Sequence, residues 1–170
     1  MLLAASTLGL VACEDAPKTT TLRRVEDPWA FAQAAMASGP LLIVVRGLPS
    51  PASEATVEDA VLQATQAAVT WTATPLFTVI PARAAPSNLH LVYIFNGRPS
   101  ADPCSENVLG GEWQQGGRIS LLAALCDGTS MLVRVDGLLK RHDGVEDRRF
   151  AKLIGQAARE LLAPPPAPRP

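Results

Sequence analysis

The chain has 170 residues, enough for one domain with its own hydrophobic core. Its 15 Lys and Arg residues nearly balance 16 Asp and Glu residues, so the sequence lacks the basic excess that is typical of nucleic-acid-binding proteins. No apolar run reaches the roughly 20 residues that a membrane-spanning helix needs. We therefore expect one folded domain that neither binds nucleic acid nor crosses a bilayer.

The chain begins with an apolar run that ends in Leu10-Val11-Ala12-Cys13, after which the sequence becomes polar. This order resembles the lipobox of bacterial lipoproteins, in which a small residue precedes the cleavage point and the next cysteine receives a diacylglyceryl group. The apolar stretch and Ala12 suit export and cleavage. The resemblance implies a signal peptide over residues 1–12, an acylated (palmitate-bearing) Cys13, and a protein held by lipid at the periplasmic face of a bacterial membrane.

Two details refine this expectation. No Lys or Arg precedes the apolar run, which favours a true start upstream of Met1. In enterobacteria-like sorting an Asp after the lipidated cysteine favours the inner membrane, so Glu14 slightly favours the outer membrane. The alternative is the apolar terminus of a cytosolic protein, with Cys13 an ordinary thiol.

The chain contains three cysteines. If Cys13 carries lipid, Cys104 and Cys126 remain as an even pair in an oxidising compartment, where a disulfide is the expected state. Two free buried thiols and a metal site are the alternatives. Neither His90 nor His142 has a recognisable zinc-ligand spacing to these cysteines, and a closed zinc site needs four ligands. We expect no metal and no cofactor.

Three regions are distinguished by composition. Residues 13–26 are mostly polar and aperiodic and are expected to form a flexible tether. Residues 27–162 alternate apolar runs with turn signals and are expected to form a single α/β domain. Residues 163–170 are mostly proline and are expected to form a disordered tail.

Within the domain, Asp27 and Pro28 predict the N-cap and first position of a short helix that ends at Gly39-Pro40. A second helix is predicted from the cap at Ser53 to about Thr70. Apolar and β-branched runs predict strands, of which the last two flank an Asp-Gly turn as in a hairpin. The strands are predicted over Leu41–Val45, Thr74–Ala82, Leu89–Phe95, Arg118–Leu125 and Met131–Leu138.

The strongest helix pattern comes last, with acidic Glu146 and Asp147 at its start, where negative charge suits the helix dipole. The elements predict an α/β (α+β) fold: a mixed sheet of about five strands packed with two main helices, in the order β-α-β-β-β-β-α after a short N-terminal helix. The final helix is predicted from apolar residues at three- and four-residue steps: Phe150, Leu153, Ile154, Ala157, Ala158, Leu161 and Leu162.

Residues 96–117 form a long segment without an apolar pattern, and loops of this length are usually functional or disordered. Trp113 stands there among polar residues that include Arg98 and Glu112, as in sites that anchor a partner. The alternative is that Trp113 covers the sheet edge or the disulfide. A bond between Cys104 and Cys126 would hold this segment against the hairpin tip.

The sequence contains no Gly-x-Ser-x-Gly, His-Glu-x-x-His or phosphate-binding motif, so we expect no catalytic residue. The Gly110-Gly111 and Gly116-Gly117 pairs lack the lysine and helix that phosphate binding needs, and are expected to make the loop flexible. His90 is expected to be an ordinary strand residue. His142 and Asp143 are expected in a solvated turn.

The stretch from Gly117 to Leu162 resembles uncharacterised proteobacterial lipoprotein domains. The matching features are Gly117-Arg118-Ile119, Ala123-Ala124-Leu125-Cys126 and Asp147-Arg148-Arg149-Phe150. Some structural relatives of these domains are similar to those in activators of cell-wall synthases and in curli-secretion lipoproteins. The resemblance transfers no functional residue except the anchor, Cys13.

The leading hypothesis is a non-enzymatic, lipid-anchored module that binds a protein partner in an envelope assembly. The alternative is a periplasmic small-ligand binder or enzyme that uses a cleft beside residues 97–117. A flat exposed apolar patch would favour the partner-binding module. A deep pocket that gathers Glu106, Glu112 or His90 with another titratable group would favour the second.

Overall fold

The computed structural model of the chain describes residues 15–50, 52–72, 76–114 and 116–164. The predicted signal peptide, the lipidation site at Cys13 and most of the proline-rich tail lie outside these residues. The elements are β1 (Lys18–Arg24), α1 (Pro28–Met36), β2 (Leu41–Arg46), β3 (Pro49–Ser50), α2 (Glu54–Ala68), β4 (Phe77–Thr78), the 3-10 helix η1 (Pro81–Arg83), β5 (Leu89–Phe95), β6 (Trp113–Gln114), β7 (Ile119–Asp127), β8 (Ser130–Leu139) and α3 (Arg148–Leu162).

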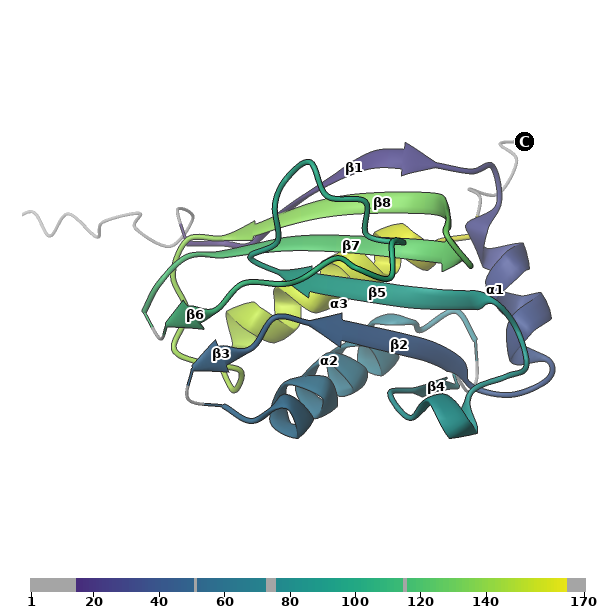
Figure 1. Cartoon of the computed structure of the whole chain (residues 1–170), viewed down its shortest axis with the longest axis horizontal. Helices are drawn as coiled ribbons and strands as arrows, with labels where there is room; N and C mark the ends of the chain where they lie inside the picture. The colour runs from purple at the N-terminus through teal and green to yellow at the C-terminus, as the bar shows by residue number, and fades with distance from the viewer. Residues whose placement is uncertain (1–14, 51, 73–75, 115, 165–170) are drawn as a thin grey trace, which may run out of the picture.

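The predicted α+β fold with a mixed sheet is confirmed (Figure 1). The main sheet has six strands in the order β1-β8-β7-β5-β2-β4, and β3 and β6 form a second, two-stranded sheet. In the main sheet β2 runs parallel to both β4 and β5, whereas the remaining neighbours are antiparallel. The expected number of strands was about five, and β1 accounts for the difference.

The predicted tether over residues 13–26 is wrong for its second half, because Lys18–Arg24 is an edge strand. Lys18 pairs with Leu138, and the pairing continues along β8. The hydroxyl groups of Thr19 and Thr21 donate to the carboxylate of Glu160 on α3. Because this edge strand is exposed to solvent, its sequence has no alternation of apolar and polar residues. It becomes a strand because its backbone pairs with the otherwise unpaired edge of β8. The folded domain therefore begins at Lys18 rather than at residue 27.

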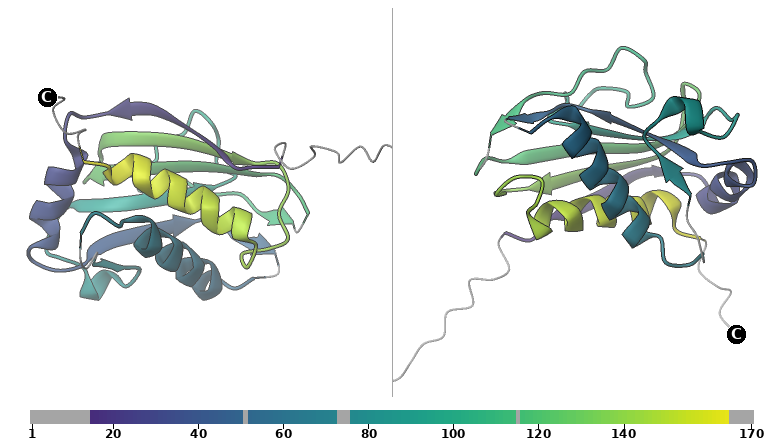
Figure 2. Two further views of the ribbon diagram at one scale, coloured as in Figure 1. Left: turned by 180° about the vertical axis from the view of Figure 1, so that it is seen from behind. Right: turned by 90° about the horizontal axis from the view of Figure 1, so that it is seen from below.

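The helices cover one face of the main sheet (Figure 2). Helices α2 and α3 pack against each other on that face, and α1 packs against α3, β2 and β5 near one end of the sheet. All seven apolar positions of the predicted final helix are buried there. The predicted caps are also confirmed: Asp27 accepts from the backbone N–H of Ala30 at 3.1 Å, and Ser53 accepts from that of Thr56 at 3.3 Å.

The predicted strand over Thr74–Ala82 is mostly wrong. Among the residues of this range that the structure describes, 76–82, only Phe77–Thr78 pairs, with the start of β2, and the 3-10 helix η1 begins at Pro81. Proline has no backbone N–H to donate to a sheet and fixes φ, so Pro81 ends the extended segment that its β-branched neighbours favour.

The predicted hairpin of β7 and β8 is confirmed and is longer than expected. Asp127 pairs with Ser130, so the turn contains only two residues, Gly128 and Thr129. Gly128 has φ of +57°, a backbone conformation that glycine adopts without steric cost. Cys126 consequently lies within the strand and not in the turn.

The N-terminus of α3 is held by Asp147. Its carboxylate accepts from the backbone N–H of Arg149 at 2.8 Å and from that of Asp143 at 2.9 Å, and it forms an ion pair with the Arg149 guanidinium at 2.8 Å. Burial raises the pKa of Asp147, but the hydrogen bonds from Arg149 and Asp143 and the charge of Arg149 together lower that pKa to about 2.

We expect Asp147→Asn to lower the free energy of unfolding at pH 7 by about 2 kcal/mol, at roughly 1.4 kcal/mol per pKa unit. A carboxylate whose pKa lies below its ordinary value stabilises the fold above about pH 4, and this contribution is lost as the pH falls toward 2. Urea unfolding at pH 7 and pH 2.5 measures the difference in free energy of unfolding between the parent chain and Asp147→Asn. This difference should be smaller at pH 2.5. Asp59→Asn, at an exposed position of α2, is the control with little expected effect. A difference that is equal at both pH values would contradict the prediction.

Candidate functional site

The face of the sheet opposite the helices is covered by the segment from Gly97 to Glu112, here named the covering loop (Figure 1). Its apolar side chains close a second, smaller core over β5 and β7, so this face is packed although no helix lies on it. The buried members of this core are Val92, Ile94, Cys104, Leu122, Ala124 and Cys126, with Val44, Ala101, Val108 and Met131 packed against them.

The predicted disulfide fixes the middle of the covering loop to the sheet. The sulfur atoms of Cys104 and Cys126 lie 2.00 Å apart, and both residues are buried. The backbone N–H of Cys104 also donates to the Asp102 carboxylate at 3.0 Å. The loop is thereby held near the hairpin turn, as the sequence predicted.

An arginine on β2 holds one side of the covering loop. The guanidinium of Arg46 donates to the backbone carbonyl oxygens of Glu106 at 2.7 Å and of Val108 at 2.8 Å. Sequence reasoning missed this role. The only signal was a charged residue at the end of an otherwise apolar strand.

A second arginine, on β8, holds the other side. Arg134 donates to the backbone carbonyl oxygens of Pro99 at 2.7 Å and of Ala101 at 3.2 Å. The carboxylate of Asp136 orients the same guanidinium through an ion pair at 2.8 Å. Three independent attachments therefore keep the covering loop in one position.

The expectation that Gly110-Gly111 makes the loop flexible is wrong, because this pair is a point of close packing. A Cβ on Gly110 would lie 2.4 Å from the backbone nitrogen of Gly47. Gly47 itself has φ of +88°. The backbone N–H of Gly111 donates to the carbonyl oxygen of Phe95 at 2.9 Å. The glycines allow the two backbones to touch, which fixes this end of the loop.

Asn96 joins the two ends of the loop. It has φ of +50°, and its side-chain oxygen accepts from the backbone N–H of Ser120 at 2.8 Å. Its side-chain amide donates to the carbonyl oxygen of Glu112 at 3.2 Å. Short polar side chains tolerate this backbone conformation when they bond locally, as Asn96 does.

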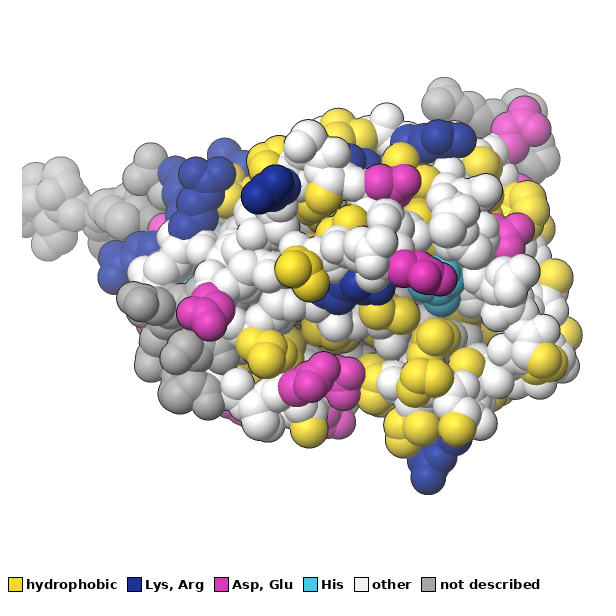
Figure 3. Space-filling model, in the orientation of Figure 1, with side chains coloured by type: hydrophobic (Ala, Val, Ile, Leu, Met, Phe, Trp, Pro, Cys, Tyr) yellow, Lys and Arg dark blue, Asp and Glu magenta, His cyan; other side chains and the backbone are white. Residues whose placement is uncertain are grey.

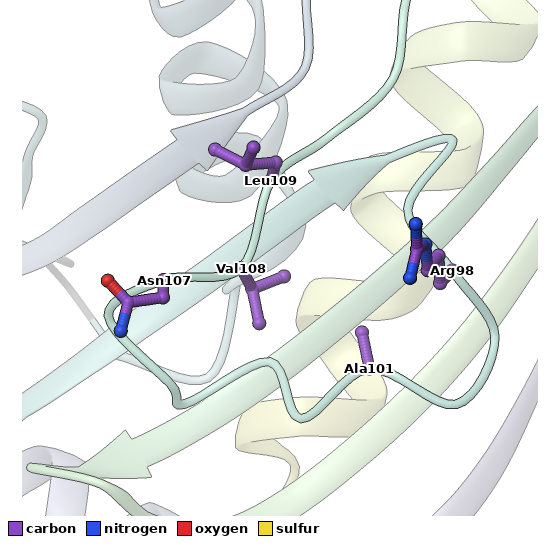
Figure 4. A pocket seen from close by; sticks show the side chains of 5 residues that line it. All are labelled: Arg98, Ala101, Asn107, Val108 and Leu109. Atoms are coloured by element: carbon purple, nitrogen blue, oxygen red, sulfur yellow. The ribbon is translucent and has the colours of Figure 1, made fainter.

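Arg98, one of the predicted binding residues, lines a hollow of about 370 Å³ beside the covering loop. Figure 4 shows Arg98 across this hollow from Asn107, with Val108 and Ala101 between them. Leu109 completes its lining.

Glu112 lines a different hollow, of about 380 Å³, on the β2 side of the loop. Its charged residues are Arg46, Glu54 and Glu112, and its apolar ones include Leu48 and Leu109. The structure therefore does not bring Arg98 and Glu112 into one hollow. Trp113 lies in β6, where its backbone pairs with Pro49, and its side chain is outside the described part.

Val108 and Leu109 line both hollows, and Leu109 is the more exposed of the two. The Leu109 side chain is 81 % exposed, and Leu48 beside the second hollow is 41 % exposed. Figure 3 shows this face, on which hydrophobic side chains lie among polar and charged ones. We name Leu48 and Leu109 the leucine patch. No sequence pattern indicated it, since an isolated leucine in a loop looks like any buried one.

The two histidines have different surroundings. Nδ1 of His90 lies 2.8 Å from the carbonyl oxygen of Asn88. His142 is 1 % exposed, so the predicted solvated turn is wrong at this residue. The carbonyl oxygen of His142 accepts from the backbone N–H of Gly116, in the turn before β7, at 2.7 Å. Nδ1 of His142 accepts from the backbone N–H of Gly144 at 3.0 Å.

Among the residues that the structure describes, no three His, Cys, Asp or Glu side chains form a group that could hold a metal ion. In the same ranges, no helix combines the length and apolar character needed to cross a membrane.

No family model matches the chain, and no curated protein matches it. A similar solved structure is a single-substitution variant of the PelC dodecamer from Paraburkholderia phytofirmans. The two chains are 13% identical, the match covers 86% of this chain and 98% of that chain, and the TM-score is 0.47. This similarity assigns neither a family nor a function to the present chain.

Proposed function

We propose that this protein is anchored through lipid on Cys13 at the periplasmic face of a bacterial membrane, with the outer membrane favoured. There it acts as a non-enzymatic module that binds a protein partner of the cell envelope through the leucine patch. Arg98 and Glu112 flank the patch as its charged rim. The lipobox-like Leu10-Val11-Ala12-Cys13 supports the anchor, and the buried Cys104–Cys126 disulfide is typical of a protein from an oxidising compartment.

The observation that carries the partner-binding proposal is the 81 % exposure of Leu109 on a loop held at several points. Transfer of a large apolar side chain out of water has a favourable free energy, and such residues anchor protein interfaces. The disulfide, Arg46 and Arg134 hold the loop backbone in place before binding. The conformational entropy lost on binding is therefore small, which favours affinity.

A photoreactive amino acid at position 109 of the full chain, in the cells that produce it, tests this proposal. We expect a discrete cross-linked protein in the membrane fraction, with palmitate incorporated into the same chain. The same photoreactive residue at position 31, where Phe31 is 48 % exposed on α1, is the matched control. Cys13→Ala should lose both the palmitate and the cross-link.

Two results would contradict the proposal. Cross-linking from position 109 that does not exceed the control at position 31 would remove the leucine patch as a binding site. Palmitate that is absent from the chain, or that persists after Cys13→Ala, would remove the anchor.

The hollow beside β2 supports the alternative of a periplasmic small-ligand binder or enzyme, because Glu54 and Glu112 line it together with Arg46. Both hydrogen bonds of the Arg46 guanidinium to the loop use Nη1, so the two carboxylates and the remaining N–H groups of Arg46 are the groups left to bind a ligand. A small molecule that stays with the purified protein and is lost in Glu112→Gln would favour this alternative.

A further inference from the structure

Segments that are far apart in the sequence meet at the end of the main sheet where β1 begins. Lys18 on β1 is opposite Leu138 of β8, and Ile119 on β7 is opposite Leu139. Neighbouring strands lie about 4.8 Å apart, so the residues next to these pairs share an area roughly 10–15 Å across. We name the four cations at this end the basic end: Lys18, Arg118, Lys140 and Arg141.

The four side chains of the basic end are exposed. Within the described residues, no ion pair or hydrogen bond engages them. The nearby carboxylates of Asp143 and Asp147 bind Arg149 instead, at 2.9 and 2.8 Å, and the charge of Asp15 acts on Arg149 as well. Figure 3 shows Lys and Arg side chains gathered at this end of the molecule. The basic end is thus a positive surface with no partner in the described part of the domain.

Lys18 of the basic end is close in the chain to the proposed lipidation site at Cys13, and this indicates what the basic end binds. Lys18 is five positions after Cys13, and a fully extended chain spans at most about 3.6 Å per residue. The Cα of Lys18 therefore lies within roughly 18 Å of a lipidated Cys13. Lysine and arginine side chains extend beyond the backbone, and electrostatic attraction acts over a Debye length of about 8 Å.

We infer that the basic end binds the anionic phospholipid headgroups of the bilayer that holds the anchor, and thereby orients the domain on the membrane. This inference rests on the proposed anchorage at Cys13. The leucine patch lies on the covering-loop face beside the end of β2, and β5 separates β2 from the strands β7, β8 and β1 that carry the basic end.

Vesicle binding by the unacylated protein tests this inference. The chain from residue 13 onward, with Cys13→Ala, contains the whole domain, and its binding to phosphatidylglycerol-containing vesicles is compared with binding to phosphatidylcholine vesicles. We expect salt-sensitive binding to the anionic vesicles only. At roughly a fivefold effect for each basic residue, the triple variant Arg118→Gln, Lys140→Gln and Arg141→Gln should weaken binding on the order of 100-fold.

The triple variant Arg23→Gln, Arg83→Gln and Arg159→Gln removes the same charge elsewhere and should bind almost as well as the parent chain. An equal loss in this control would overturn the inference, as would equal binding to both kinds of vesicle or to neither. Because the chain carries no lipid, these results are independent of whether Cys13 is acylated in cells.

A measurement on the unsubstituted side chains covers the case in which the first triple variant does not fold. Anionic vesicles should protect Lys18 and Lys140 from an amine-reactive reagent, whereas Lys152 on the exposed face of α3 should react as it does without vesicles. Protection of Lys152 to the same extent, or of none of the three, would contradict binding through the basic end.

Discussion

Gly110→Ala is expected to lower the free energy of unfolding by roughly 2–4 kcal/mol. The added Cβ would lie 2.4 Å from the nitrogen and 2.5 Å from the Cα of Gly47, and 2.6 Å from the carbonyl carbon of Arg46. All three atoms belong to the backbone, so no side chain can rotate away. The covering loop must move off the end of β2, which also displaces Leu109 next to the substitution.

Urea unfolding of Gly110→Ala measures this effect, and Gly155→Ala is its matched control. A Cβ on Gly155 would lie 3.4 Å from the Cβ of Ala68, an ordinary contact. Alanine is also the better helix former, so the control should be neutral or stabilising by up to about 1 kcal/mol. Equal unfolding midpoints for Gly110→Ala and the parent chain would show that the loop does not pack against Gly47.

Replacing both cysteines of the disulfide by alanine is expected to lower the free energy of unfolding by about 3 kcal/mol. The bond between Cys104 and Cys126 closes a loop with a sequence separation of 22 residues, and the chain-entropy model assigns about 3 kcal/mol to a loop of this length. Arg46 and Arg134 still bind the covering loop in this variant, so the domain should remain folded.

Thermal or urea unfolding with and without a thiol reductant tests this prediction. The reductant should destabilise the parent chain by a similar amount once the buried bond is reduced in the unfolded state, and it should not affect the double variant. Proteolysis should also cut the covering loop faster in the variant, since one of its attachments is gone. A variant as stable as the oxidised parent chain would contradict the prediction.

The parts of the fold that the sequence predicted are those in which a local pattern and the tertiary environment agree. The repeat of apolar residues from Phe150 to Leu162 matches a helix with one buried face. The Asp-Gly turn between two apolar runs correctly predicted the hairpin of β7 and β8. Pro81 shows the opposite case, because β-branched neighbours favoured a strand that proline ended after two residues.

The candidate site was predicted only in outline. The long segment, its disulfide and its position over the hairpin followed from the cysteine pair and from the missing apolar pattern. The leucine patch did not, because exposure of Leu109 depends on how Arg46 and Arg134 hold the loop. These contacts join residues that are about 30 to 60 positions apart, so they cannot be predicted from the pattern of residues within one segment.

The fold class, the final helix and the hairpin were predicted from the amino-acid order, because they depend on local patterns of apolar and turn residues. The pairing of Cys104 with Cys126 was predicted from the count of cysteines on the condition that Cys13 carries lipid, and the structure contains this bond. The strand at Lys18–Arg24 and the packing point at Gly110 required the folded structure. An exposed edge strand takes its conformation from the unpaired backbone groups of β8. The close contact at Gly110 requires the backbone of Gly47, which belongs to another part of the chain.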